Sequence, residues 1–169
     1  MNALQAIATR RSIRKFSDEQ VSEETIRALL EAAMAAPSAG NQQPWVFVLV
    51  DRRPLLEEIS QIHPFAGMAK SAAGAVVVCG DLERERYAGY WVQDCSAATQ
   101  NLLLAAHALG LGAVWVGIYP SPDRVDSFRR LLCLPASIVP LALVPFGRPA
   151  ENKAESGRFD ELRIHRNTW

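Results

Sequence analysis

The 169-residue sequence lacks the features that mark several large classes of protein. Lys plus Arg and Asp plus Glu each number 18, so the formal net charge is zero and no overall charge attracts nucleic acid or anionic lipid. No apolar run approaches the ~18 residues of a membrane span, and the first residues lack the apolar core of a signal peptide. We therefore expect a single cytoplasmic domain covering residues 1–169, with no nucleic-acid and no membrane partner.

Cysteine and the common cofactor motifs are also scarce. Cys79, Cys95 and Cys133 lie far apart without a C-x-x-C pair, which argues against a disulfide framework and predicts three buried thiols. The three histidines are too scattered to predict a metal site. The absence of G-x-G-x-x-G after a strand, of G-x-x-x-x-G-K-[ST] and of G-x-S-x-G disfavours dinucleotide-binding folds, P-loop proteins and serine hydrolases.

The hydrophobic pattern predicts alternating helices and strands. Ser22 is a plausible N-cap for a helix that Pro37 ends, and Gly110 suits a left-handed cap of the longest helix. The other predicted helices cover about 55–62, 87–109 and 122–132, and the predicted strands cover 45–50, 75–79, 112–118 and 138–144. The segment 147–169 has no core-forming pattern, which predicts that it wraps over another surface, such as a partner subunit.

The run RRSIRK, residues 10–15, is a cationic cluster in an otherwise neutral chain. In an extended segment, side chains alternate, so Arg10, Ser12 and Arg14 would project to one side. Two guanidinium groups with a hydroxyl between them suit a phosphate monoester, because the forked donors match its oxygens. The alternative interpretation is a solvated basic turn after the first helix.

The stretch PSAGNQQP, residues 37–44, is dense in amide and hydroxyl groups. It is either a plain helix-to-strand connector or a surface for a flat, polar ligand. In the long helix that follows, Asp94 and Asn101 are seven residues apart and share a face. Their polar groups either support a site or bind neighbouring backbone, and we favour the second interpretation.

Four segments resemble the FMN-dependent nitroreductase family, and the likeness runs in order from Arg10 to Arg158. They are RRSIRKF, PSAGNQQPW, QDCSAATQNLLLAAHALGLGAVWVG and LPASIVPLALVPFGRPAE. The resemblance implies an α+β fold with a central, mostly antiparallel sheet flanked by helices, and a homodimer with two FMN sites at the subunit interface. It also implies that the C-terminal tail wraps the partner subunit.

The resemblance further implies roles for residues near the chain ends. Arg10, Ser12 and Arg14 match the family's phosphate-binding motif, and Arg11 would add a backbone contact. Arg148 or Arg158 would complete the phosphate site. The family often has Lys and Arg two residues apart near this point, whereas here Ser156 precedes Arg158, so one expected cation is absent.

The remaining implied contacts concern the flavin ring. The family's loop reaches the flavin from the neighbouring subunit, and its residues here are Pro37, Ser38 and Ala39, with Asn41 and Gln43 supplying amide contacts or fixing the loop. Val116 and Gly117 resemble the strand end where a backbone N–H approaches the reactive flavin nitrogen. Lys70 lies near a position that contacts the pyrimidine side of the flavin in some relatives.

The activity implied by the resemblance is that of an NAD(P)H-dependent FMN oxidoreductase, which would reduce nitroaromatic, quinone or similar acceptors by a ping-pong mechanism. No catalytic side chain is needed, because the flavin carries the chemistry. Flavin-dependent dehydrogenation, dehalogenation or flavin fragmentation remain alternatives on the same fold, and residues 63–68 over the flavin would help to separate them. A non-enzymatic flavin carrier or sensor is the remaining alternative.

Overall fold

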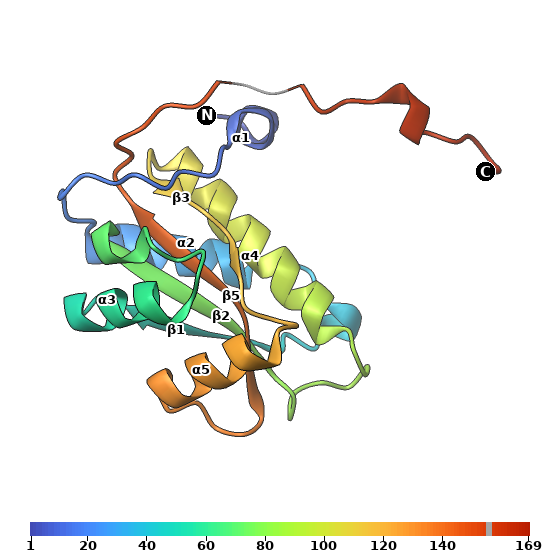
Figure 1. Cartoon of the computed structure of the whole chain (residues 1–169). Helices are drawn as coiled ribbons and strands as arrows, with labels where there is room; N and C mark the ends of the chain where they lie inside the picture. The colour runs from blue at the N-terminus through green and yellow to red at the C-terminus, as the bar shows by residue number, and fades with distance from the viewer. Residues whose placement is uncertain (155–156) are drawn as a thin grey trace.

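An antiparallel sheet forms the centre of the computed structural model, which describes residues 1–154 and 157–169 (Figure 1). Its strands lie in the order β1 (Trp45–Val50), β2 (Gly74–Asp81), β5 (Ile138–Gly147) and β3 (Gly112–Ala113), and β4 (Val116–Gly117) also pairs with β5. All four strand pairs are antiparallel, while an isolated parallel bridge joins Ser12 to Ala113. The expected α+β fold with a mostly antiparallel sheet is confirmed.

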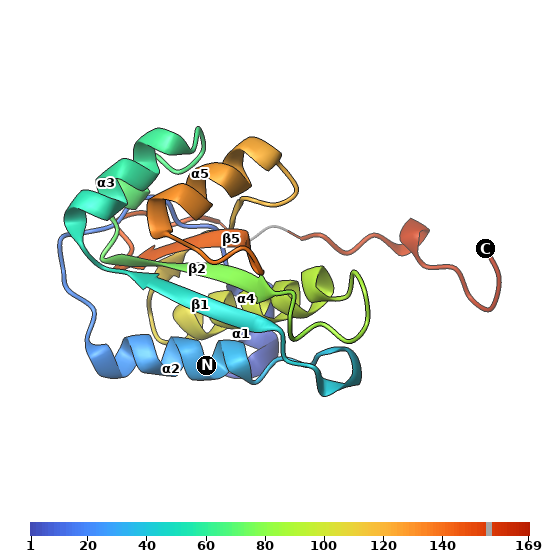
Figure 2. The ribbon, with the colours of Figure 1, turned by 90° about the horizontal axis from the view of Figure 1, so that it is seen from below.

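Helices cover both faces of this sheet (Figure 2). On one face lie α2 (Glu23–Met34) and α4 (Trp91–Ala108), with α1 (Ala3–Thr9) packed against α4. On the other face lie α3 (Arg53–Ile62) and α5 (Pro122–Leu132). Three short 3₁₀ turns, η1 (Ala39–Asn41), η2 (Ala69–Ser71) and η3 (Glu161–Arg163), complete the described elements. No described helix has both the length and the apolarity needed to cross a membrane.

The sequence of β2 is a continuous apolar run because both faces of this strand are buried. Val76 and Val78 pack into the core shared with α2 and α4, whereas Val77 and Cys79 pack into the core shared with α3 and α5. Because successive side chains of a strand point to opposite faces, burial on both faces requires apolar residues at every position. The sheet is therefore the middle layer between two apolar cores.

Two predicted element boundaries were wrong. The long helix begins at Trp91 and not near Tyr87, because Gly89 has a φ of 85°, outside the helical range. The predicted strand 112–118 is interrupted between β3 and β4, where Val114 falls opposite Pro145 in the register of the flanking pairs. Proline has no N–H to donate to a ladder, which accounts for the break.

The structure confirms two predicted helix ends and contradicts one predicted burial. Ser22 caps α2 by accepting from Thr25 N, and Gly110 ends α4 with a φ of 77°, as predicted. The prediction of three buried thiols was wrong for Cys133, which is exposed. It occupies the left-handed C-cap of α5, with a φ of 51°, beyond the apolar face of that helix.

The chain after β5 has two parts. Residues 149–154 lie beside residues 11–16, since Ala150 N donates to Lys15 O and Pro149 bridges to Phe16. From Gly157 onward, the chain leads away from the three layers (Figures 1 and 2). This arm exposes large apolar side chains, including Phe159, Leu162 and Trp169, the last at 99 %. The expected wrapping of the arm over a partner subunit stays a prediction.

Candidate functional site

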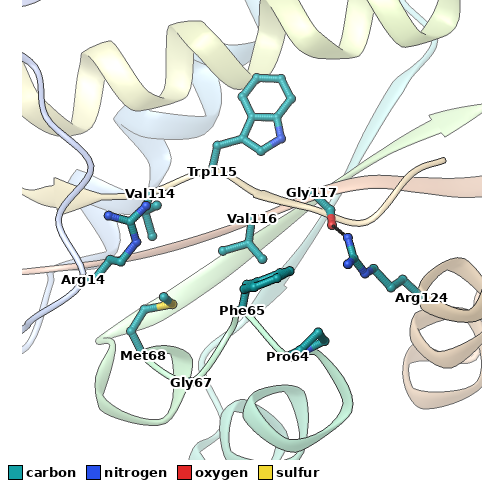
Figure 3. Close-up of a pocket in the computed structure, with 10 residues that line it drawn as sticks. All are labelled: Arg14, Pro64, Phe65, Gly67, Met68, Val114, Trp115, Val116, Gly117 and Arg124. Carbon is teal, nitrogen blue, oxygen red and sulfur yellow. Dashed lines mark hydrogen bonds between the residues drawn. The ribbon is translucent and has the colours of Figure 1, made fainter. Parts of the chain in front are cut away.

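A cavity of about 530 Å³ lies beside β4; we call it the Arg14 cavity (Figure 3). The chain segment 114–117 forms one side, and residues from 64 to 68, between α3 and η2, form another. Arg14 and Arg124 lie at opposite sides of the opening. The volume is typical of a small-molecule or cofactor site.

Gly117 presents bare backbone to this cavity. A Cβ added at this residue would meet no atom within 4 Å, so a ligand can approach the main chain there. Its carbonyl oxygen accepts from His63 Nε2 at 2.9 Å and from Arg124 Nη1 at 3.2 Å. Because His63 Nδ1 accepts from Phe65 N, the ring proton of neutral His63 lies on Nε2 and points to Gly117.

Arg14 is placed by its own backbone and by the C-terminal segment. Its N–H donates to Glu151 Oε1 at 2.6 Å, and Lys153 Nζ donates to Ser12 O at 2.7 Å. These bonds fix the extended segment that includes Ser12, which also bridges to Ala113. The Arg14 N–H bond is the main cause of a lowered pKa at Glu151, so this carboxylate stays charged.

A second cavity, of about 560 Å³, gathers three guanidinium groups: Arg10, Arg11 and Arg158 line it together. Burial, then the charges of Arg158 and Arg11, lower the pKa of Arg10. Arg10 and Arg14 therefore line different cavities, unlike the shared side expected from an extended segment. Arg10 is the C-cap of α1, so strand-like alternation does not reach it.

The other predicted cations have defined partners. Arg11 Nε donates to Ala154 O at 2.9 Å, and its Nη1 donates to Ala8 O and Arg10 O. Arg148 forms an ion pair with Glu19 at 2.9 Å and lines neither cavity. The Lys70 side chain is exposed on η2 and lines neither cavity, while its carbonyl accepts from Arg53. Ser156 lies outside the described residues.

The loop 37–43 is held by a buried carboxylate of α4. Asp94, which is 4 % exposed, accepts from Ala39 N at 2.9 Å and from Gln42 Nε2 at 2.7 Å. Gln42 Oε1 accepts in turn from Arg86 N and Tyr87 N. Asp94 thus binds neighbouring backbone, as we favoured, and in doing so it fixes this loop.

The outer part of the loop has an unusual backbone. Gly40, Asn41 and Gln43 have φ values of 52°, 54° and 47°, in the left-handed region. Gln43 Nε2 donates to Asn41 Oδ1, and Gln43 N donates to Ser38 Oγ. Pro37, Ser38 and Ala39 line a shallow pocket against α4, which shares no lining residue with the Arg14 cavity. The two sites are therefore separate within one chain.

His107 is a hydrogen-bonded histidine that lines a further hollow together with Thr9 and Arg11. Its Nε2 lies 2.8 Å from Thr9 Oγ1, and Thr9 donates its own hydroxyl proton to Gln5 O, so His107 is the donor. Burial, then the charges of Arg10 and Arg11, lower the pKa of His107. The described residues contain no group of three or more His, Cys, Asp or Glu side chains that could hold a metal ion.

Three residues of these sites were not singled out from the sequence. Gln42 was passed over for its neighbours Asn41 and Gln43, although it is the buried amide of the loop. Lys153 was missed because a second cation was sought at residue 156, and it lies three residues before that point. Arg124 carried no sequence signal, since it is one of many charged residues on a surface helix.

Comparisons with known proteins show which family this chain resembles. The model of the nitroreductase family matches residues 7–80 and 64–148. A Methanothermobacter thermautotrophicus protein, provisionally named NADH dehydrogenase/NAD(P)H nitroreductase, is 51 % identical over 169 residues, covering 100 % of this chain and 88 % of its own.

Solved structures give the same result. A Parabacteroides distasonis protein with the same provisional name has a TM-score of 0.95 and 43 % identity, and the match covers 98 % of each chain. A provisionally named nitroreductase from Desulfovibrio desulfuricans, in complex with FMN, has a TM-score of 0.86 and 35 % identity, covering 100 % of this chain and 99 % of that one. The chain belongs to the nitroreductase family.

Proposed function

We propose that this chain is an NAD(P)H-dependent oxidoreductase that binds FMN in the Arg14 cavity and passes electrons to small aromatic or quinone-like acceptors. The observation that carries the proposal is the open backbone at Gly117, beside a cavity with a cation at its edge. Relatives named for this activity include the oxygen-insensitive NADPH nitroreductase of Salmonella typhimurium, 30 % identical over 182 residues.

The residues present fit FMN in size and in charge. The cavity volume of about 530 Å³ suits a ligand of this class. Arg14, at the edge of this cavity, forms no ion pair with a carboxylate among the described residues. A phosphate bound beside Arg14 would supply an acceptor for this guanidinium.

When bound, FMN supplies the chemistry of hydride and electron transfer. The protein's part is to bind and to orient. Arg14 would hold the phosphate, and Gly117 leaves the main chain accessible to the ring. Phe65, Met68 and Trp115 line the cavity with apolar surface, which would limit water around the ring.

A homodimer would complete the site. The loop 37–43 is separate from the Arg14 cavity of its own chain, so we place it over the cavity of a partner. The Ala-rich helix α4 and the apolar residues of α1 form an exposed apolar hollow lined by Ala6, Ile7, Leu104 and Ala105, among others. An arm that exposes Phe159 and Leu162 would also gain from a partner surface.

Turnover tests the enzymatic part of the proposal. We expect oxidation of NADH or NADPH to require an acceptor, and a panel of quinones and nitroaromatics to support it. Plots of reciprocal rate against reciprocal acceptor concentration should be parallel at different NAD(P)H concentrations. In a ping-pong mechanism the oxidised nicotinamide leaves before the acceptor enters the same space. A protein that binds FMN and never turns over would instead be a flavin carrier or sensor.

Mixed dimers test the shared site. We expect Arg14→Ala and Ser38→Trp homodimers, both folded, to hold little FMN, because each lacks one half of every site. A heterodimer would carry one doubly altered and one intact site, so up to about half of its sites should regain flavin. If proven subunit exchange restores no flavin, the loop and the Arg14 cavity of each site belong to one chain.

A further inference from the structure

The Arg14 cavity has more positive charge at its edge than one phosphate needs. Arg14 and Arg124 approach it from different elements, the segment after α1 and the first turn of α5, and they lie near opposite ends of the segment 114–117, Arg14 by Val114 and Arg124 by Gly117 (Figure 3). A phosphate bound near Arg14 leaves the second guanidinium at the far side. Arg124 therefore faces the part of the cavity left to another ligand.

Arg124 is held in place by a backbone carbonyl and an aromatic ring. Its Nη1 donates to Gly117 O at 3.2 Å, and its guanidinium carbon lies 5.6 Å from the centroid of the Phe65 ring. No carboxylate of the described residues lies within 4.0 Å of its nitrogen atoms. A guanidinium has five N–H donors, so most of its donors remain available.

The bond to Gly117 does not by itself account for Arg124. His63 already donates to the same carbonyl at a shorter distance, 2.9 Å, and His63 is 1 % exposed. The Phe65 ring beside Arg124 is 66 % exposed and lines the cavity. Arg124 and Phe65 thus form an oriented cationic and aromatic pair at the opening, which is suited to a flat ring that carries an anion.

We infer that Arg124 is a specificity-determining residue that binds an anionic oxygen group, a carboxylate or a phosphate, carried by the molecule that enters the Arg14 cavity beside the flavin. The inference rests on the proposed function. Two sources share this chemistry: an acidic substituent on an aromatic acceptor and the 2′-phosphate that distinguishes NADPH from NADH. In the first case, the preferred acceptors are anionic aromatic molecules; in the second case, the preferred reductant is NADPH.

Matched ligands that differ in charge test the inference. Acceptor preference is the ratio of kcat/KM for 4-nitrobenzoate to that for 4-nitrobenzyl alcohol, measured with NADH. We expect Arg124→Met to lower this ratio about tenfold, which is the lower end of a charge-assisted hydrogen bond because Arg124 is partly exposed. Arg124→Lys keeps the charge without the fork, so its ratio should lie between those of the other two proteins.

Two further measurements separate the sources and remove the need for turnover. A fall in the NADPH-to-NADH ratio of kcat/KM in Arg124→Met, with an unchanged acceptor ratio, would assign the site to the dinucleotide phosphate. Calorimetric titration of the purified protein with benzoate, and with benzamide as its uncharged reference, reports binding alone. We expect Arg124→Met to raise the dissociation constant of benzoate about tenfold relative to that of benzamide.

Three results would decide against the inference or against the proposed function. If Arg124→Met leaves all these ratios unchanged, Arg124 binds no anion. If charged and neutral ligands weaken in parallel, Arg124 only braces Gly117 and Phe65, and Arg124→Gln should show the same parallel loss. If the wild-type protein turns over no acceptor, the proposed function fails, while the benzoate titration still decides the role of Arg124.

Discussion

Replacement of Arg14 by Ala should weaken FMN binding by roughly one to two orders of magnitude. A charge-assisted hydrogen bond contributes ~1.5 to 3 kcal/mol, and every ~1.4 kcal/mol is tenfold in affinity. Arg14 lines the cavity, and its backbone is fixed by Glu151, so the loss should reflect the side chain rather than the segment. Fluorescence titration of the flavin-free protein measures the dissociation constant.

Two controls distinguish a lost phosphate contact from damage to the fold. Riboflavin lacks the phosphate, so its affinity should change little in Arg14→Ala. Lys15→Ala removes the adjacent positive charge. Because Lys15 is exposed and lines none of the cavities described above, the Lys15→Ala protein should bind FMN with nearly the wild-type affinity. Equal losses for FMN and riboflavin would mean that Arg14 supports the fold and not the phosphate.

Replacement of Asp94 by Ala should lower the free energy of unfolding by about 2 to 4 kcal/mol. The substitution leaves Ala39 N–H and the Gln42 amide without an acceptor in a buried place, and each unpaired group costs ~1 to 3 kcal/mol. Part of this cost is offset because a buried carboxylate no longer has to be desolvated. Denaturant unfolding, followed by the midpoint and its slope, measures the change.

The neighbouring residue Gln93 is the matched control for Asp94. It lies on the same helix and lines the same shallow pocket against the loop 37–43, but it is exposed and forms no described hydrogen bond. Gln93→Ala should therefore change stability by less than ~0.5 kcal/mol. An Asp94→Ala protein that unfolds at the wild-type denaturant concentration would show that Asp94 does not hold the loop.

Local pattern was enough to predict most of the fold. Helical spacing located α2 and α3, and apolar runs located β1, β2 and β5, because these signals lie within a few neighbouring residues. The break opposite Pro145 was missed, since it depends on which strand pairs with β5 and in what register. Sheet order is a long-range property that the period of a single segment does not encode.

The candidate site was predictable only in part for the same reason. Motif resemblance picked out Arg14, Val116 and Gly117, which line one cavity. Asp94 and Ala39 are 55 residues apart, and Lys153 and Ser12 are 141 apart, so their bonds follow from tertiary folding. The guanidinium of Arg124 over Phe65 likewise joins the first turn of α5 to the segment after α3.

Flavin released from the purified protein tests the central claim most directly. Denaturation followed by chromatography separates FMN from FAD and quantifies each against protein concentration. We expect a yellow protein that releases FMN, at about one molecule per chain after reconstitution, because each chain of the proposed dimer supplies one Arg14 cavity. A colourless protein that takes up no FMN on reconstitution, or one that releases FAD, would contradict the account.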